Sequence, residues 1–333
     1  MDRAARERAA RALIAVGGAA AVAGAAGALA AAVDRADAVG RWRSSAAAEA
    51  YRTAYADALA ALPAPARTLD VPGSYGSVRT YVWEDVLTQG RVPLLLLPTA
   101  GHPTPTWLPN LPTLIAERPV IAVDPIGDAG LSLQSAPVRA TTEVARWIAE
   151  VLAAVTDGPA HVVGHGLGGW QAAMLALHRP HLAASLALWD PAFVVAPTSA
   201  VVAAQLLPGY LSGAPRPLRR LGLRRSTAGS TAEVDARVAR LIDAGITEYA
   251  PQRPFPVRPN DTDLRLLPMP VLLALGERSL LHDAQAAAEH AFQVIPRVRV
   301  RLWPGATHAL PAERAGGLDR ELLTFVSEVE VKG

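Results

Sequence analysis

The chain has 333 residues, of which 51% are hydrophobic and 19% are charged. This apolar content excludes a disordered chain and is sufficient for one large domain with an insertion. Arginine and lysine together number 32 against 30 acidic residues, and the chain contains no cysteine. The near balance of charge argues against a nucleic-acid partner, and the lack of cysteine excludes disulfides, thiolate catalysis and cysteine-based zinc sites.

The N-terminal segment, residues 1–35, has the layout of a signal peptide or membrane anchor. Residues 12–33 carry no charge and follow a short segment that contains Arg3, Arg6, Arg8 and Arg11. The run is long enough to span a bilayer, but most of its side chains are Ala or Gly, so the driving force for insertion is marginal. We expect export or membrane anchoring; the alternative is an Ala-rich helix packed on a cytoplasmic protein.

The next segments predict a helical preface followed by an α/β core. Apolar side chains recur at helical spacing from residue 48 to 62, which indicates a preface over residues 36–66. Short apolar runs typical of strands then alternate with helical patterns at residues 142–155 and 171–177, as expected for a mostly parallel sheet. The expected strands are residues 69–71, 78–83, 92–97, 120–123, 160–163, 184–188, 271–275 and 298–302.

The alternation is interrupted once, by a stretch rich in proline and arginine. We interpret residues 196–258 as a helical lid insertion over one edge of the sheet. The core is then divided into a first part, residues 67–195, and a second part, residues 259–333.

A glycine-rich turn follows the strand that ends near Val163. It reads Gly164-His165-Gly166-Leu167-Gly168 and leads into a helical pattern. Strand, tight turn and helix together are typical of the nucleophile elbow, whose pattern is G-x-S-x-G. The central position of this elbow is Gly166, where the pattern has serine.

From about residue 68 to 329 the chain resembles the α/β-hydrolase superfamily, and within it the carboxylesterase-like members that have a helical preface. The matching motifs occur in the expected order: Thr106-Trp107-Leu108-Pro109-Asn110, Asp124-Pro125-Ile126-Gly127-Asp128, the elbow, Leu275-Gly276-Glu277 and Pro304-Gly305-Ala306-Thr307-His308. The resemblance implies an eight-stranded, mostly parallel sheet flanked by helices. It also implies that His308, on the last loop, is the catalytic histidine.

The resemblance leaves two candidates for the acid that orients His308. Relatives place the acid after the seventh strand, but that slot is Ser279 here. Asp283 lies four residues further on, and Asp190 ends the sixth strand, where other members of the superfamily keep their acid. We favour Asp283 over Asp190, although Asp283 also suits the N-cap of the helix that follows it.

The oxyanion loop departs from the usual pattern as well. Where many relatives have His-Gly, this chain has Pro98-Thr99-Ala100-Gly101-His102. The backbone N–H groups of Thr99, Ala100 and Leu167 are the candidate oxyanion donors. His102 and Trp107 are expected near the same pocket. We expect no cofactor and no metal, since no histidine and carboxylate pair has helical spacing suited to zinc.

Glycine at the elbow excludes ordinary acyl-enzyme chemistry at that position, because it has no oxygen nucleophile. Ser132, Ser135 and Ser279 lack the elbow's orientation. The missing side chain is expected to leave a small polar space beside His308 that a water can occupy. Two hypotheses follow: His308 acts as a general base in hydrolysis, lyase or cyclase chemistry on a small lipophilic ligand, or the protein is a pseudoenzyme that binds a ligand or partner.

Overall fold

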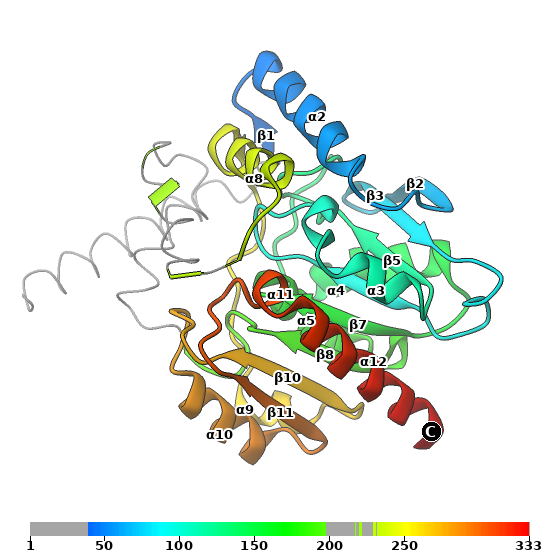
Figure 1. Ribbon diagram of the computed structural model, residues 1–333, viewed down its shortest axis with the longest axis vertical. Helices are drawn as coiled ribbons and strands as arrows, with labels where there is room; N and C mark the ends of the chain where they lie inside the picture. Colours follow the sequence, from blue (N-terminus) through cyan, green and yellow to red (C-terminus); the bar gives the residue numbers. More distant parts are fainter. Residues whose placement is uncertain (1–38, 198–216, 218–219, 222–228, 231, 333) are drawn as a thin grey trace, which may run out of the picture.

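The computed structural model describes residues 39–197, 217, 220–221, 229–230 and 232–332 (Figure 1). The expected membrane segment, residues 1–35, lies outside the described residues, as does most of the first half of the expected lid. No helix in the described part of the chain is both long enough and apolar enough to span a bilayer.

One large sheet forms the centre of the described chain. Eight of its strands run in the order β11-β10-β8-β7-β4-β5-β3-β2, and a short strand, β6, pairs with β3. All neighbouring pairs from β11 to β5 are parallel, and β3 pairs antiparallel with β2, β5 and β6. The strands are β2 (Arg67–Gly73), β3 (Gly76–Trp83), β4 (Leu94–Leu97), β5 (Val120–Val123), β6 (Leu133–Gln134), β7 (Ala160–His165), β8 (Ala183–Trp189), β10 (Val271–Gly276) and β11 (Val298–Trp303).

Helices cover both faces of this sheet, so its inner strands are buried on both sides. In β4, Leu95 and Leu97 pack on the face covered by α4, α5 and α10, and Leu94 and Leu96 pack on the face covered by α2, α3 and α12. The period of two along a strand produces this division. Figure 1 shows α12 crossing in front of the sheet. The helices are α2 (Ser45–Leu59), α3 (Leu111–Ile115), α4 (Thr141–Val155), α5 (Leu167–His178), α10 (Ala284–Val294) and α12 (Ala315–Lys332).

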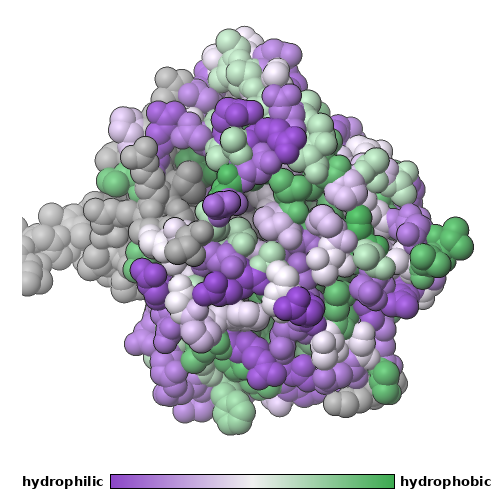
Figure 2. Space-filling view, viewed as in Figure 1, coloured by the Kyte–Doolittle hydropathy of each residue, from purple (hydrophilic) through white to green (hydrophobic). Residues whose placement is uncertain are grey.

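Smaller elements complete the described chain. They are α8 (Ala236–Glu248), α9 (Asp261–Arg265), α11 (Leu310–Glu313), the 3-10 turns η1 (Thr104–Trp107) and η2 (Pro180–Leu182), and a separate ribbon of β1 (Arg41–Trp42) and β9 (Tyr249–Ala250). On the face shown in Figure 2, hydrophilic residues predominate and hydrophobic ones form small, separate patches.

The β1–β9 ribbon joins the preface to the lid region. Strand β1 pairs antiparallel with β9, and α2 packs against α8. The ring of Trp42 lies 4.3 Å from that of Tyr51 on α2 and 4.9 Å from that of Tyr249 on β9. Sequence patterns did not predict this ribbon, since two-residue strands carry no periodicity. It helps to hold α8 beside the loops that contain Gly101 and Ala129, which Gly245 of α8 approaches.

Candidate active site

The elbow is built as its sequence predicts. Gly166 lies between β7 and α5 with φ 54° and ψ −116°, in the left-handed half of conformational space where glycine pays no steric cost. A Cβ at Gly168 would overlap the carbonyl oxygen of Leu97, and one at Gly164 would overlap that of Gly168. Both neighbours must therefore be glycine for α5 to approach β4 and β7 this closely.

His308 is paired with Asp190. The Nδ1 atom of His308, on the loop after β11, lies 2.7 Å from Oδ2 of Asp190. Asp190 directly follows β8 with φ 44°, a conformation that aspartate tolerates better than most residues. The His308 side chain is mostly buried, and within the described residues its Nε2 atom has no hydrogen-bond partner. This arrangement leaves Nε2 available to accept a proton.

The preference for Asp283 as the partner of His308 was wrong. Asp283 is exposed, and its carboxylate accepts a hydrogen bond from Ala286 N–H at 3.0 Å, which caps α10. Ser279, which occupies the expected acid slot, instead donates to Asp190 Oδ2 at 2.7 Å. Sequence spacing could not decide between the two carboxylates, because both follow neighbouring strands, β8 and β10.

Asp190 is fully buried and has four polar contacts. Besides His308 and Ser279, the N–H of Gly276 donates to Oδ1 at 3.2 Å, and Nε2 of His282 lies 3.5 Å from Oδ1. Burial by itself raises the pKa of Asp190, but the contacts with His282 and His308 outweigh it and hold the pKa well below its usual value. Asp190 is therefore ionised and can stabilise a protonated His308. The motif analysis did not find His282 or the role of Ser279.

The expected water-sized space at Gly166 is filled by Thr99. A Cβ built on Gly166 would overlap Thr99 Oγ1, would lie 2.8 Å from Thr99 Cβ and would lie 2.9 Å from His308 Cε1. The N–H of Leu167 donates to Thr99 Oγ1 at 3.3 Å. The hydroxyl group thus lies where an elbow side chain would begin. The expectation of an empty polar space beside His308 was therefore wrong. The Thr99 side chain points toward the elbow and fills this space.

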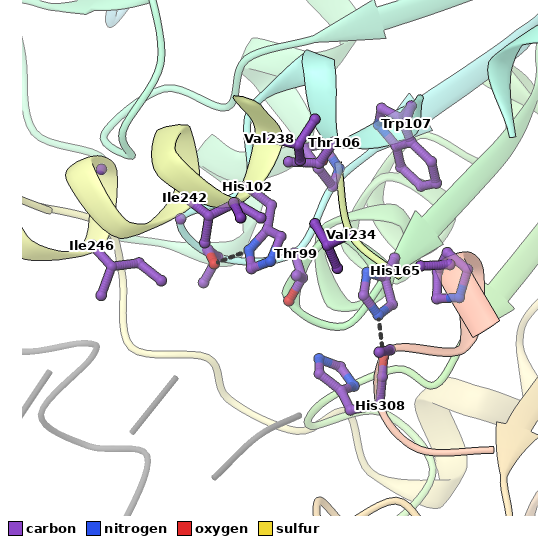
Figure 3. A pocket seen from close by; sticks show the side chains of 18 of the residues that line it. Thr99, His102, Thr106, Trp107, His165, Val234, Val238, Ile242, Ile246 and His308 are labelled. Atoms are coloured by element: carbon purple, nitrogen blue, oxygen red, sulfur yellow. Dashed lines mark hydrogen bonds between the residues drawn. The ribbon is translucent and has the colours of Figure 1, made fainter. Parts of the chain in front are cut away.

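A cavity of about 500 Å³ opens beside these groups. Helix α8 contributes an apolar wall to this cavity (Figure 3). The wall is formed by Val238, Ile242 and Ile246, which lie on one face of the helix because they are four residues apart. Thr99, Ala100, His102, Trp107 and His308 also line it, so the structure brings most of the predicted pocket residues together. The Arg253–Asp128 ion pair, with N and O 2.7 Å apart, lies in the wall. Neither this ion pair nor the contribution of α8 follows from the sequence motifs, because both depend on contacts between distant residues.

Two further histidines lie beside the pair. His102 Nδ1 is 2.9 Å from the carbonyl oxygen of Ala100, and burial lowers its pKa. His165 Nε2 is 2.8 Å from the carbonyl oxygen of His308, a contact drawn in Figure 3. Burial, reinforced by the neighbouring His308, lowers the pKa of His165 well below its usual value. A neutral His165 can donate to that carbonyl and fix the His308 loop.

Among the residues that the structure describes, no group of three or more His, Asp or Glu side chains is placed to hold a metal ion. The groups that the site does present are His308 with its free Nε2, the ionised Asp190, the Thr99 hydroxyl and the Leu167 N–H.

The fold is that of α/β hydrolases. Residues 94–320 match the model of the Alpha/beta hydrolase family, and the chain belongs to this family. It is 25% identical over 243 residues to Carboxylesterase YbfK of Bacillus subtilis (strain 168), covering 70% of this chain and 79% of the relative. The crystal structure of naproxen esterase (carboxylesterase NP) from Bacillus subtilis matches with a TM-score of 0.77 at 22% identity, over 85% of this chain and 99% of that chain.

Proposed function

We propose that the protein is an enzyme of esterase-like chemistry that works without a serine at the elbow. His308, oriented by Asp190, acts as a general base on an O–H group above Gly166. The observation that carries this proposal is the 2.7 Å contact between His308 Nδ1 and Asp190, with Nε2 left without a partner among the described residues. A general base needs this combination of a fixed ring and an available nitrogen.

The ligand we propose is small and lipophilic. The cavity of about 500 Å³ falls within the usual range for small-molecule sites, and α8 contributes an apolar wall to it. The relatives that are named carboxylesterases support ester hydrolysis over the lyase and cyclase alternatives. In hydrolysis the proton that His308 accepts passes to the leaving alcohol, so that ester and water give acid and alcohol.

A second candidate function is ligand binding without turnover. The observation that favours it is the position of Thr99. Its Oγ1 overlaps the position that a side chain at Gly166 would take, and it accepts a hydrogen bond from the N–H of Leu167. If Thr99 only fills this space, the protein is a pseudoenzyme whose cavity still binds a lipophilic molecule.

Hydrolysis of p-nitrophenyl acetate and butyrate by the full chain distinguishes these functions. His308→Gln and Asp190→Asn are expected to lower the rate by about 10²–10⁴, the usual contribution of general-base catalysis. Asp283→Asn is the matched control, since its carboxylate caps α10 and does not contact His308. Circular dichroism and thermal melts check that each variant folds. A wild-type rate equal to that of His308→Gln, together with retained binding of an apolar dye, would establish the pseudoenzyme instead.

A further inference from the structure

We infer that Thr99 is the nucleophile of this site, supplied by the loop after β4 in place of a residue at the elbow. The inference rests on the proposed function and identifies the O–H group on which His308 acts. Thr99 Oγ1 and His308 Cε1 both lie against the point where a Cβ on Gly166 would be. The hydroxyl and the imidazole therefore face the same small volume at the N-terminus of α5. Figure 3 shows the side chains of Thr99 and His308 in the pocket.

The surroundings of the hydroxyl fit a nucleophile. Among the described residues, the Thr99 hydroxyl proton has no acceptor and His308 Nε2 has no donor, so each lacks what the other can provide. Thr99 is mostly buried but lines the cavity, which places its oxygen at the boundary between the protein and a bound ligand. Valine has the same shape but could neither accept the bond from the Leu167 N–H nor offer a proton to His308.

The Leu167 N–H is placed to serve the reaction. Its bond to Thr99 Oγ1 is 3.3 Å long, beyond the common range for N–H donors to oxygen, and is therefore weak. When Oγ1 attacks a carbonyl carbon, the oxyanion forms on the former carbonyl oxygen, which is bonded to the carbon that Oγ1 has attacked. The same N–H can then turn to that oxyanion, where a charged acceptor makes the stronger bond.

The proposed reaction has two covalent stages, acylation of Thr99 and hydrolysis of the resulting threonyl ester. A lone pair of Thr99 Oγ1 attacks the ester carbonyl carbon while the hydroxyl proton passes to His308 Nε2, and Asp190 stabilises the imidazolium. Collapse of the tetrahedral intermediate breaks the bond to the alkoxy oxygen, which leaves with the proton from His308. Water then attacks the threonyl ester, its proton passes to His308, and the same proton returns to Oγ1 as the acid leaves. The substrate class is an uncharged ester with a small apolar acyl group, in keeping with the cavity wall.

Fluorophosphonate labelling tests this assignment, because the probe forms a stable adduct with an activated hydroxyl. The full-length protein is incubated with the probe, and the adduct is measured by intact mass and located by peptide mapping. We expect one adduct, on Thr99, in the wild type and in Ser135→Ala, a control that removes a loop hydroxyl that does not line the cavity. Thr99→Val and His308→Gln should each lower the labelling rate more than about 100-fold. Thr99→Ser, which keeps the hydroxyl, should retain labelling at position 99.

The other possible results separate failure of the Thr99 assignment from failure of the proposed function. His308-dependent ester hydrolysis that persists in Thr99→Val, with no adduct in the wild type, would mean that water attacks directly; the nucleophile assignment fails and the proposed function stands. Absence of both the adduct and His308-dependent hydrolysis in the wild type would overturn both. If Thr99→Val does not fold, the adduct's position in the wild type and in Thr99→Ser still decides the assignment.

Discussion

At the scale of single residues, positions 99 and 166 share one space. A serine Cβ at position 166 would overlap Thr99 Oγ1 and would lie only 2.8 Å from Thr99 Cβ. Gly166 also has φ 54°, where any side chain adds strain. Restoring the elbow serine therefore depends on what stands at position 99.

We predict that Gly166→Ser alone destabilises the protein by more than about 3 kcal/mol, because strain at positive φ adds to overpacking against Thr99. Thr99→Gly combined with Gly166→Ser removes the overlap with Thr99, so the double variant should be less stable than Thr99→Gly only by the strain at positive φ, about 1–3 kcal/mol. Urea denaturation of the four proteins gives the coupling energy between the two sites. Additive effects would show that Thr99 moves aside at no cost.

At the scale of elements, α12 carries a buried carboxyl into the interface with α3. Asp319 is fully buried, and Asn110 Nδ2 donates to its Oδ1 at 2.8 Å. Its Oδ2 has no hydrogen-bond partner among the described residues. Burial raises the pKa of Asp319 to about 7, only partly offset by Asn110. In the folded protein the protonated form of this residue therefore predominates below about pH 7.

The raised pKa predicts a pH-dependent stability. The unfolded chain releases this proton near pH 4, so the stabilising contribution is complete below that pH and is lost as the pH rises from about 4 to 7. Asp319→Asn cannot ionise and should be more stable than the wild type above pH 7, by up to about 4 kcal/mol, with a similar stability near pH 4. Thermal melts across this range measure the difference. Asp157→Asn, at an exposed turn, controls for general charge effects, and equal pH profiles for wild type and Asp319→Asn would contradict the prediction.

At the scale of the whole molecule, the arginine-rich start and the apolar residues 12–33 predict export or attachment to a membrane. In cells that express the chain with a C-terminal tag, we expect the protein in the membrane or exported fraction. Deletion of residues 1–35 should move it to the soluble cytoplasm, since the described domain begins at residue 39. Recovery of the intact full-length chain only from the soluble cytoplasm would refute this prediction.

The sheet was predictable because its signals are local, whereas the site depends on contacts between distant residues. The apolar runs at 120–123 and 271–275 coincide with β5 and β10 to within one residue, since a strand buried on both faces must be apolar throughout. Gly166 and His308 were identified from motifs that follow strands. The pairing of His308 with Asp190 joins residues 118 positions apart, and no spacing rule distinguishes it from a pairing with Asp283.

The overlap between Thr99 and position 166 also constrains how this protein can change in evolution. While Thr99 is present, a single mutation that places serine at the elbow is opposed by a steric clash. Losing Thr99 first leaves the buried Leu167 N–H without its acceptor, which carries a cost of its own. A change to serine at the elbow therefore passes through a less stable protein whichever of the two positions mutates first. We expect descendants of this chain to keep both residues or to replace both.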